Sequence, residues 1–246
     1  MVDNPYFIYD GVDSRTLKIQ MQREIVLDGA KPNIEKITIP GRNGTLDYWD
    51  GSYENREAVA RCFILDNDAS GYFAQAQKWA QSPVYRRLEL SNEPDVYMMA
   101  TVADSGDREI LQGVLAPFKI TFDCKPQKYL KTGETEFEIT NGDTLHNSWF
   151  EAKPLIRIYI TGGGGTSGAL KVGSATVVLS DVSSNIMIDC ETQNAYSIGL
   201  GGAIANANNK IQTLNFPTLP PGDTEISWVG DISIAKMQIV PRWWRL

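Results

Sequence analysis

The sequence predicts a mainly β protein built from two domains. Short runs of β-branched and aromatic residues recur along the chain and are separated by turns rich in glycine, proline and asparagine. Only one segment shows the periodicity of an amphipathic helix. Proline, glycine and charged residues interrupt this succession of strand-like runs near residue 130, and no helical period occurs beyond it. We therefore expect domains at 1–130 and 131–246, each long enough to bury a core of its own.

The first domain is expected to combine strands with this single helix, over Ala69–Gln81. Asp68 can cap the helix, because its carboxylate accepts amide hydrogens of the first turn. Ser82-Pro83 would end it, since the residue before proline avoids the helical region. Its apolar side chains should share one face, packed on a sheet: Tyr72, Phe73, Ala76, Trp79 and Ala80. The strands expected around it are Tyr6–Tyr9, Leu17–Gln20, Glu35–Ile39, Arg86–Leu90, Tyr97–Val102 and Val114–Asp123.

The second domain is expected to be an antiparallel β-sandwich, because short strand-like runs follow one another closely and none has a helical period. The terminal segment Pro241–Leu246 is too apolar to fray, so Trp243 or Trp244 should be docked on the domain. The strands expected are Phe137–Thr140, Leu155–Ile160, Thr176–Leu179, Asn185–Cys190, Ile226–Val229 and Ile232–Val240.

The stretch Gly41–Leu65 is the most distinctive part of the sequence. Asn43-Gly44 and Asp50-Gly51 are turn signals, and Ala58–Leu65 is a strand candidate. We expect two strands joined by an aromatic and acidic loop. Interleaved aromatic and charged side chains are typical of a contact with another protein, although aromatics that cap their own sheet would look the same. The residues in question are Asp47, Tyr48, Trp49, Asp50, Tyr53, Glu54 and Arg56.

Charge and cysteine content exclude several classes of function. The net charge is −7 and neither half is basic, which argues against direct nucleic-acid binding. Cys62, Cys124 and Cys190 are odd in number and lie in apolar runs, so buried free thiols and synthesis in a reducing compartment are expected. No signal-peptide pattern and no apolar run of about 20 residues is present, which predicts a soluble protein with no membrane contact.

No catalytic, cofactor or metal site is predicted. His146 is the only histidine, and we expect it in a solvated turn at Thr144–Ser148. Oxygen ligands for calcium are conceivable at Asp66–Asp68, but no EF-hand spacing follows them. The glycine-rich stretches at 161–168 and 199–202 lack the context of a phosphate loop and are expected to be hairpin loops.

Several blocks spread over the chain give it a family resemblance. The sequence resembles the distal tail proteins (Dit) of siphophages, the phages of Gram-positive bacteria with long non-contractile tails, or of a related prophage. The blocks that carry the resemblance are FIYDGV at 7–12, GRNGTLDYWDGSYENRE at 41–57, FDCKP at 122–126, KPLIRI at 153–158, IDCETQNAY at 188–196, NFPTLPPG at 215–222, ISW at 226–228 and PRWW at 241–244.

This resemblance implies an N-terminal belt domain of sheet plus helix, six copies of which form a ring, and a C-terminal galectin-like β-sandwich outside it. It implies a structural, non-enzymatic hub at the tail tip of the virion, made in the bacterial cytoplasm. The partners implied are further copies of the chain (one ring or two stacked rings), the tail tube protein, the tail-associated (Tal) protein and receptor-binding or baseplate proteins. A galectin-like fold does not itself bring a sugar site, and the sequence shows no histidine–arginine–asparagine cluster of galectin type.

Three functions are therefore weighed. The leading hypothesis is the ring-forming hub, in which a closed ring needs a heterologous interface; the candidate interface residues are Arg42, Leu46, Tyr48, Trp49, Tyr53 and Arg56. The alternative is a carbohydrate-binding module or adhesin for cell-wall glycan, with Tyr196, Trp243 or Trp244 stacked on sugar rings. The third is a glycosidase, which needs two carboxylates facing each other across a cleft.

Overall fold

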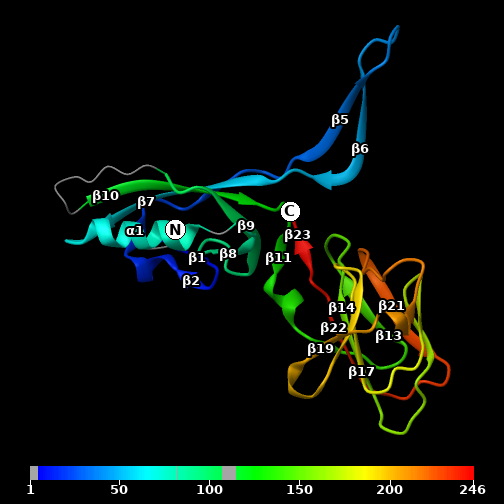
Figure 1. The fold of residues 1–246 in the computed structure, drawn as a ribbon. Helices are drawn as coiled ribbons and strands as arrows, with labels where there is room; N and C mark the ends of the chain where they lie inside the picture. Colours follow the sequence, from blue (N-terminus) through cyan, green and yellow to red (C-terminus); the bar gives the residue numbers. More distant parts are fainter. Residues whose placement is uncertain (1–4, 82, 107–114) are drawn as a thin grey trace. The chain divides into compact units, whose positions relative to one another are not determined.

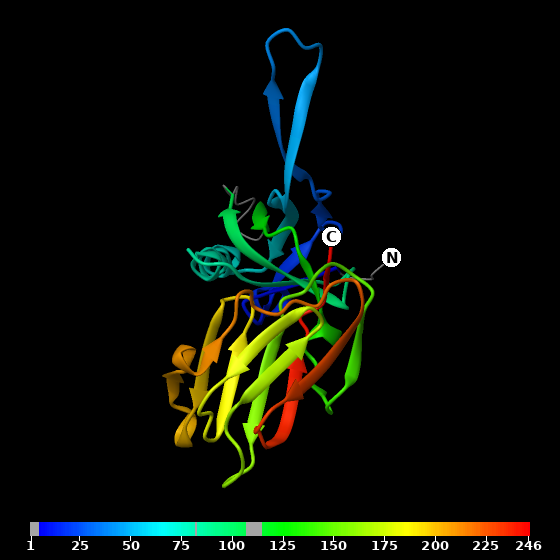
Figure 2. The ribbon, with the colours of Figure 1, turned by 90° about the vertical axis from the view of Figure 1, so that its right-hand side faces the viewer.

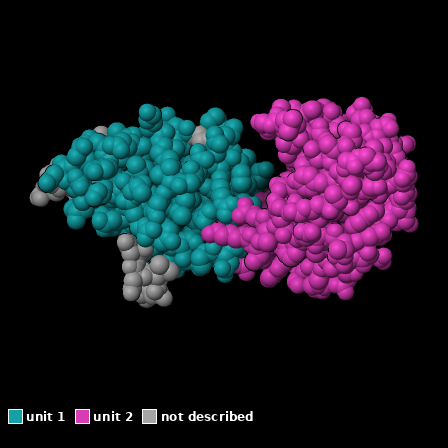
Figure 3. Space-filling model, turned by 90° about the horizontal axis from the view of Figure 1, so that it is seen from below, with its two compact units in different colours: residues 1–128, 246 teal, residues 129–245 magenta. Residues whose placement is uncertain are grey.

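The computed structural model describes residues 5–81, 83–106 and 115–246, which form two compact units. The first comprises residues up to Lys128 together with Leu246, and the second comprises Tyr129–Arg245 (Figure 3). The described residues are mainly β and contain one α-helix, as the sequence predicts.

The first unit is a twisted antiparallel sheet in the order β2-β1-β8-β9-β10-β7-β3, with β4 also paired to β7. β7 and β10 pair along their whole length, from Arg56 opposite Cys124 to Leu65 opposite Leu115. Alternate residues of β7 from Ala58 to Ile64 are buried, because successive side chains of a strand point to opposite faces. The strands are β1 (Phe7–Tyr9), β2 (Val12–Asp13), β3 (Ile19–Met21), β4 (Val26–Leu27), β5 (Pro32–Thr38), β6 (Thr45–Tyr53), β7 (Arg56–Leu65), β8 (Arg86–Leu90), β9 (Val96–Asp104) and β10 (Leu115–Cys124).

The helix α1 (Ala69–Ala80) packs its aromatic face against this sheet, as predicted. Asp68 caps it, with Oδ1 accepting a hydrogen bond from the Gly71 amide at 3.1 Å. Phe73 meets the Phe118 ring edge-on at 5.0 Å, and Trp79 stacks on Phe7 at 5.7 Å. Burial of this face holds the helix, whose 12 residues are too few to be stable alone in water. The expected stop at Ser82-Pro83 falls on Ser82, which lies outside the described residues.

The second unit is a sandwich of two antiparallel sheets (Figure 2). One sheet has the order β12-β22-β14-β17-β18-β19 and the other β13-β21-β15-β16-β20. Ile156 and Ile188 of the first sheet and Leu170 and Ile226 of the second are fully buried in one shared core. The strands are β12 (Phe137–Glu138), β13 (Asp143–Asn147), β14 (Leu155–Ile160), β15 (Gly168–Val172), β16 (Ala175–Leu179), β17 (Asn185–Asp189), β18 (Asn194–Ile198), β19 (Ile204–Asn206), β20 (Ile211–Gln212), β21 (Gly222–Val229) and β22 (Ile234–Val240).

The two ends of the second unit lie together, because β11 (Lys128–Leu130) pairs with β23 (Trp244–Arg245). The Leu130 amide donates to the Trp243 carbonyl at 2.8 Å. Gly133 allows this closeness, since a Cβ there would stand 2.4 Å from the Trp243 backbone nitrogen. Trp243 is 8% exposed, which confirms the predicted docking of the terminal tryptophans.

The stretch Gly41–Leu65 differs from its prediction. The aromatic segment is itself the strand β6, and its partner is β5 and not β7. Asp50-Gly51 is not a turn between strands: it lies inside β6, where the register with β5 shifts between Pro32 and Ile34. Gly51 has a φ of +89° at this irregularity, a backbone conformation that favours glycine because it has no Cβ.

Two further predictions were wrong in detail. Leu17 ends a 3₁₀ turn (Ser14–Leu17), and the strand begins only at Ile19. His146 lies in β13, opposite Asp223, and not in a turn. Lys18 has a positive φ of 56° that ends the 3₁₀ turn, so the strand cannot include it. The segment around His146 is poor in apolar residues and forms a strand by pairing with the distant β21. Among the described residues no helix has the length and apolarity to cross a bilayer.

Candidate interaction surface

The β5–β6 hairpin is the most exposed element of the first unit. Every residue from Pro32 to Ser52 is exposed, and Tyr53 is half-buried. The hairpin extends from the rest of its unit as a two-stranded arm (Figures 1 and 2). Two strands alone are marginally stable in water, and six large apolar side chains of the arm are exposed: Ile34, Ile37, Ile39, Leu46, Tyr48 and Trp49.

The register of the arm sorts its side chains onto two faces. Ile37 lies opposite Leu46 and Glu35 opposite Tyr48, so these four share one face, which we call the Tyr48 face. Ile34 lies opposite Trp49 and Lys36 opposite Asp47 on the other, the Trp49 face. Tyr48 and Trp49 therefore point in opposite directions, and the candidate residues do not form a single surface.

Contacts within the arm fix Trp49. Its indole nitrogen donates to the Ser52 carbonyl at 2.7 Å, and its ring meets Tyr53 edge-on at 5.6 Å. Asp50 holds the bulge, accepting from the Ser52 amide at 2.8 Å, and its hydrogen bonds to Ser52 lower the pKa of the Asp50 carboxyl. Trp49 and Tyr53 thus stabilise the arm itself, which matches the expectation that the aromatics cap their own sheet.

The base of the arm is anchored to the first unit by three consecutive residues. The Glu54 amide donates to Lys31, and Asn55 donates to the Tyr85 hydroxyl at 2.7 Å and to Asp123 at 2.9 Å. Arg56 is 5% exposed and its guanidinium donates to the Pro126 carbonyl. Burial lowers the pKa of Arg56.

The structure therefore divides the six candidate interface residues. Leu46 and Tyr48, 42% and 57% exposed, lie together on the Tyr48 face. Arg42 is exposed in the connection at the tip, where its amide donates to Ile39. Trp49 and Tyr53 are on the opposite face. Arg56 corrects the prediction, because a side chain buried in its own unit is not part of an exposed surface.

Ile37 belongs to the Tyr48 face but is not among the six candidate residues. The sequence predicts a strand at Glu35–Ile39 without indicating which strand pairs with it. Asn43-Gly44, flanked on both sides by alternating apolar residues, was the signal that could have paired the two strands.

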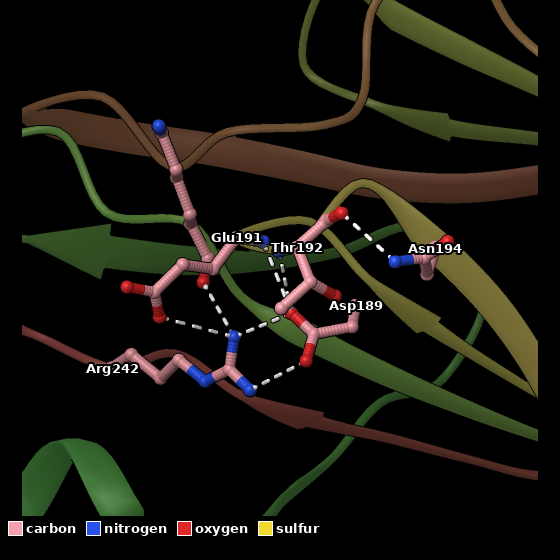
Figure 4. Close-up of polar contacts among 6 residues, drawn as sticks. Asp189, Glu191, Thr192, Asn194 and Arg242 are labelled. Carbon is pink, nitrogen blue, oxygen red and sulfur yellow. Dashed lines mark hydrogen bonds and ion pairs between the residues drawn. The ribbon is translucent and has the colours of Figure 1, made fainter. Parts of the chain in front are cut away.

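The second unit carries one largely buried charge cluster, shown in Figure 4. Arg242 donates from Nη1 to Asp189 Oδ1 at 2.7 Å and from Nη2 to Oδ2 at 3.1 Å. Asp189 also accepts from the amides of Glu191 at 3.0 Å and Thr192 at 3.3 Å. This is a satisfied ion pair that ties the terminal segment to the end of β17.

The aromatic residues considered for sugar stacking are mostly engaged within the chain. Trp243 is in the core of the second unit. Trp244 is half-buried, donates from Nε1 to the Glu151 carbonyl at 2.8 Å and stacks on Phe150 at 4.7 Å. Tyr196 is half-buried in β18. Sugar stacking at Trp243 is thus blocked by burial.

The other groups with potential chemistry have structural roles. Burial raises the pKa of all three cysteine thiols to about 12. Asp66 and Asp68 accept backbone hydrogen bonds at the start of α1, from the amides of Asp68 and Gly71. His146 Nδ1 lies 2.6 Å from Asp223 Oδ1 on an exposed strand pair. Within the residues that the structure describes, no group of three potential metal ligands is found.

Comparison with known proteins finds relatives by structure and not by sequence. No family model matches the chain, and no curated protein matches it. The Dit protein (gp 19.1) of phage SPP1, described as a hub of the adsorption apparatus in phages that infect Gram-positive bacteria, superposes with a TM-score of 0.72 at 16% identity. That match covers 96% of this chain and 97% of the SPP1 chain.

Chains of the phage p2 baseplate in its activated conformation also match. With Ca, the TM-score is 0.59 at 14% identity over 100% of this chain and 99% of the other; with Sr, it is 0.56 at 13% identity over 96% and 97%. Because both units are covered in each case, the chain has the fold of phage tail hub and baseplate proteins.

Proposed function

We propose that this chain, which has the fold of the phage Dit hub over both of its units, is a structural hub protein of a phage tail tip and not an enzyme. The observation that carries the proposal is the near-complete coverage of the SPP1 Dit chain at a TM-score of 0.72. The sequence blocks that resemble distal tail proteins support it independently, since they are spread over the same two units.

The finer proposal is a ring of six copies, with the first unit as the ring-forming belt and the second as a galectin-like sandwich. In the virion such a ring would join the tail tube protein to the Tal protein and carry receptor-binding or baseplate proteins. A ring closes when one patch of a copy meets a different patch of the next. The chain must therefore present exposed patches that a neighbouring copy can cover.

The Tyr48 face of the arm is the surface we assign to that contact. It exposes Ile37, Leu46 and Tyr48 side by side on two strands with no further sheet beneath them. Burying such a cluster is worth about 25 cal/mol per Å² of apolar surface. The arm also carries charges of both signs, Glu35 on this face and the Lys36–Asp47 pair on the other, which suits an interface with a polar rim.

The double variant Leu46→Ser, Tyr48→Ser tests this assignment. It removes apolar surface from one face and leaves the Trp49–Tyr53 contact and the anchoring base intact. We expect light scattering during gel filtration to show loss of the ring and a folded particle of one or two chains. The control is Val26→Ser, which removes an apolar side chain that is 50% exposed elsewhere on the first unit. Rings that persist in the double variant would show that the Tyr48 face is not the contact.

A further inference from the structure

The two sides of the sandwich in the second unit differ in how their edge strands are protected. On one side, β12 and β13 end the two sheets and carry Glu138, Asp143 and His146. On the other side, β19 and β20 end them, joined by the short 3₁₀ turn Asn208–Lys210. Charged residues on an edge strand normally prevent it from pairing with another chain. The side of β19 lacks this protection.

The β18–β19 hairpin is uncharged and apolar at its tip. No Asp, Glu, Lys or Arg occurs between Thr192 and Asn209, in a chain where 22% of residues are charged. Ile198 and Ile204 lie opposite each other, and Leu200 at the tip is fully exposed. Ile204 is 74% exposed (β19 is the orange strand at the border of the sandwich in Figure 2).

The register of the hairpin shows which backbone groups of β19 point outward. Gly199 donates to Ala203 and Ala207 donates to Ala195, so the hydrogen-bonded pairs with β18 fall on odd-numbered residues. Because bonded and non-bonded pairs alternate in an antiparallel ladder, the N–H and C=O groups of Ile204 and Asn206 face away from β18. In the described topology β19 is the last strand of its sheet.

We propose that β19 pairs with β19 of a second copy of this chain about a two-fold axis through Ala205. Antiparallel pairing centred there sets Ile204 of each copy opposite Asn206 of the other. Both residues point their backbone groups outward, so about four backbone hydrogen bonds form. The two sheets then become one continuous sheet across the dimer, and Ala205 of each copy lies directly opposite its equivalent.

Charge favours a second copy as the occupant of this edge. In a two-fold contact the same patch of both copies meets itself, so a patch with a net charge faces a patch of the same charge and is repelled. The chain carries a net charge of −7, whereas residues 192–209 carry no charged side chain, and the hairpin tip at 198–206 is exposed. Two copies of this edge can therefore meet without charge repulsion. A partner surface with charges is disfavoured here, because opposing Leu200 and Ile204 would desolvate them.

This contact lies in the second unit and is independent of the ring proposed for the first. For a chain whose ring contact is lost, the β19 contact alone turns a monomer into a dimer. Loss of the β19 contact therefore leaves the ring contact of the first unit intact, whereas loss of the ring contact leaves at most the β19 dimer, so the two failures are distinguishable by particle mass.

A cysteine at the two-fold position gives the sharpest test. Directly opposite residues of a non-hydrogen-bonded pair have Cα atoms about 4.5 Å apart, which is within the range of a disulfide. Under mild oxidation of the purified full chain, Ala205→Cys should form a covalent dimer at least tenfold faster than Val178→Cys. Val178 is a strand residue of the other sheet and is 40% exposed. The native thiols are buried and do not compete. Equal rates for the two variants would overturn the proposal.

A charge at the edge gives the complementary test. Ile204→Lys adds the kind of residue that protects edge strands, at a position exposed enough to leave the melting temperature unchanged. Sedimentation at rising protein concentration should show the wild type and Val178→Lys doubling in mass while Ile204→Lys does not. If all three behave alike, or if only a different protein is bound by this edge, the pairing with a second copy is refuted.

Discussion

The substitution Arg242→Met should destabilise the second unit by about 2–3 kcal/mol. Removing one member of a buried ion pair costs about 3–5 kcal/mol when the other charge is left without a partner. Here the side chains of Arg242 and Asp189 are 23% and 14% exposed, and Asp189 keeps the amides of Glu191 and Thr192. The cost is therefore below the full range. Because methionine retains the aliphatic packing of the arginine side chain, the loss of stability measures the contribution of the ion pair.

Thermal unfolding of the second unit is the assay. At about 4 °C per kcal/mol for a domain of this size, the melting temperature should fall by roughly 10 °C. The matched control is Arg157→Met, whose ion pair with Glu136 is more exposed, with side chains 31% and 40% accessible. A surface pair of that kind contributes about 1 kcal/mol or less. Equal losses from the two variants would refute the view that Arg242 holds the terminal segment.

The pH dependence follows from Asp189. Burial alone would raise the pKa of this carboxyl, but the hydrogen bonds and charge of Arg242, with the two amides, outweigh it and lower the pKa. A lowered folded pKa contributes stability that is present above the unfolded value, about 3.9, and is lost as the pH falls through the folded value. The melting temperatures of the wild type and of Arg242→Met should therefore converge on acidification below about pH 4. A difference that stays constant down to pH 2 would contradict this.

Two further predictions concern the first unit and the thiols. Asp68→Ala removes the cap of α1 and should lower the free energy of unfolding by about 1 kcal/mol, whereas Asp68→Asn should retain most of the stability. Urea unfolding measures both, and an unchanged midpoint for Asp68→Ala would show that the cap is dispensable. Cys62, Cys124 and Cys190 are buried and their pKa values are about 12, so in the native protein at pH 8 they should not react with a disulfide reagent. All three should react in guanidinium, and rapid reaction of any one without denaturant would contradict their burial.

Elements with a strong local pattern could be predicted from the sequence. The strands Arg86–Leu90 and Leu155–Ile160 have the predicted bounds, and α1 ends one residue before its prediction. Each has closely spaced apolar residues and is bounded by residues that favour turns. The sequence does not predict β13, β15 and β18, whose glycine, asparagine and polar residues give a weak strand pattern. β13 and β15 form by pairing with the distant β21, and β18 forms by pairing with its neighbour β17.

The candidate interface was only partly predictable, for a physical reason. Composition showed that the segment around Tyr48 is rich in aromatic residues, but not that it pairs with β5 as an exposed arm. Without that register, Tyr48 and Trp49 could not be assigned to opposite faces. The burial of Arg56 could have been predicted from the alternation of side chains along a strand. Arg56 is two and four residues before Ala58 and Ala60, so it points to the same, buried face of β7.

The mass and symmetry of the purified wild-type particle test the central proposal most directly. Light scattering during gel filtration gives the number of 27.3 kDa chains, and negative-stain images of the same peak give the symmetry. The account predicts a closed ring of six copies with a central opening, single or paired with a second ring. A particle that stays monomeric or dimeric at every concentration, and still does so when mixed with its tail tube protein, would contradict the ring-forming hub.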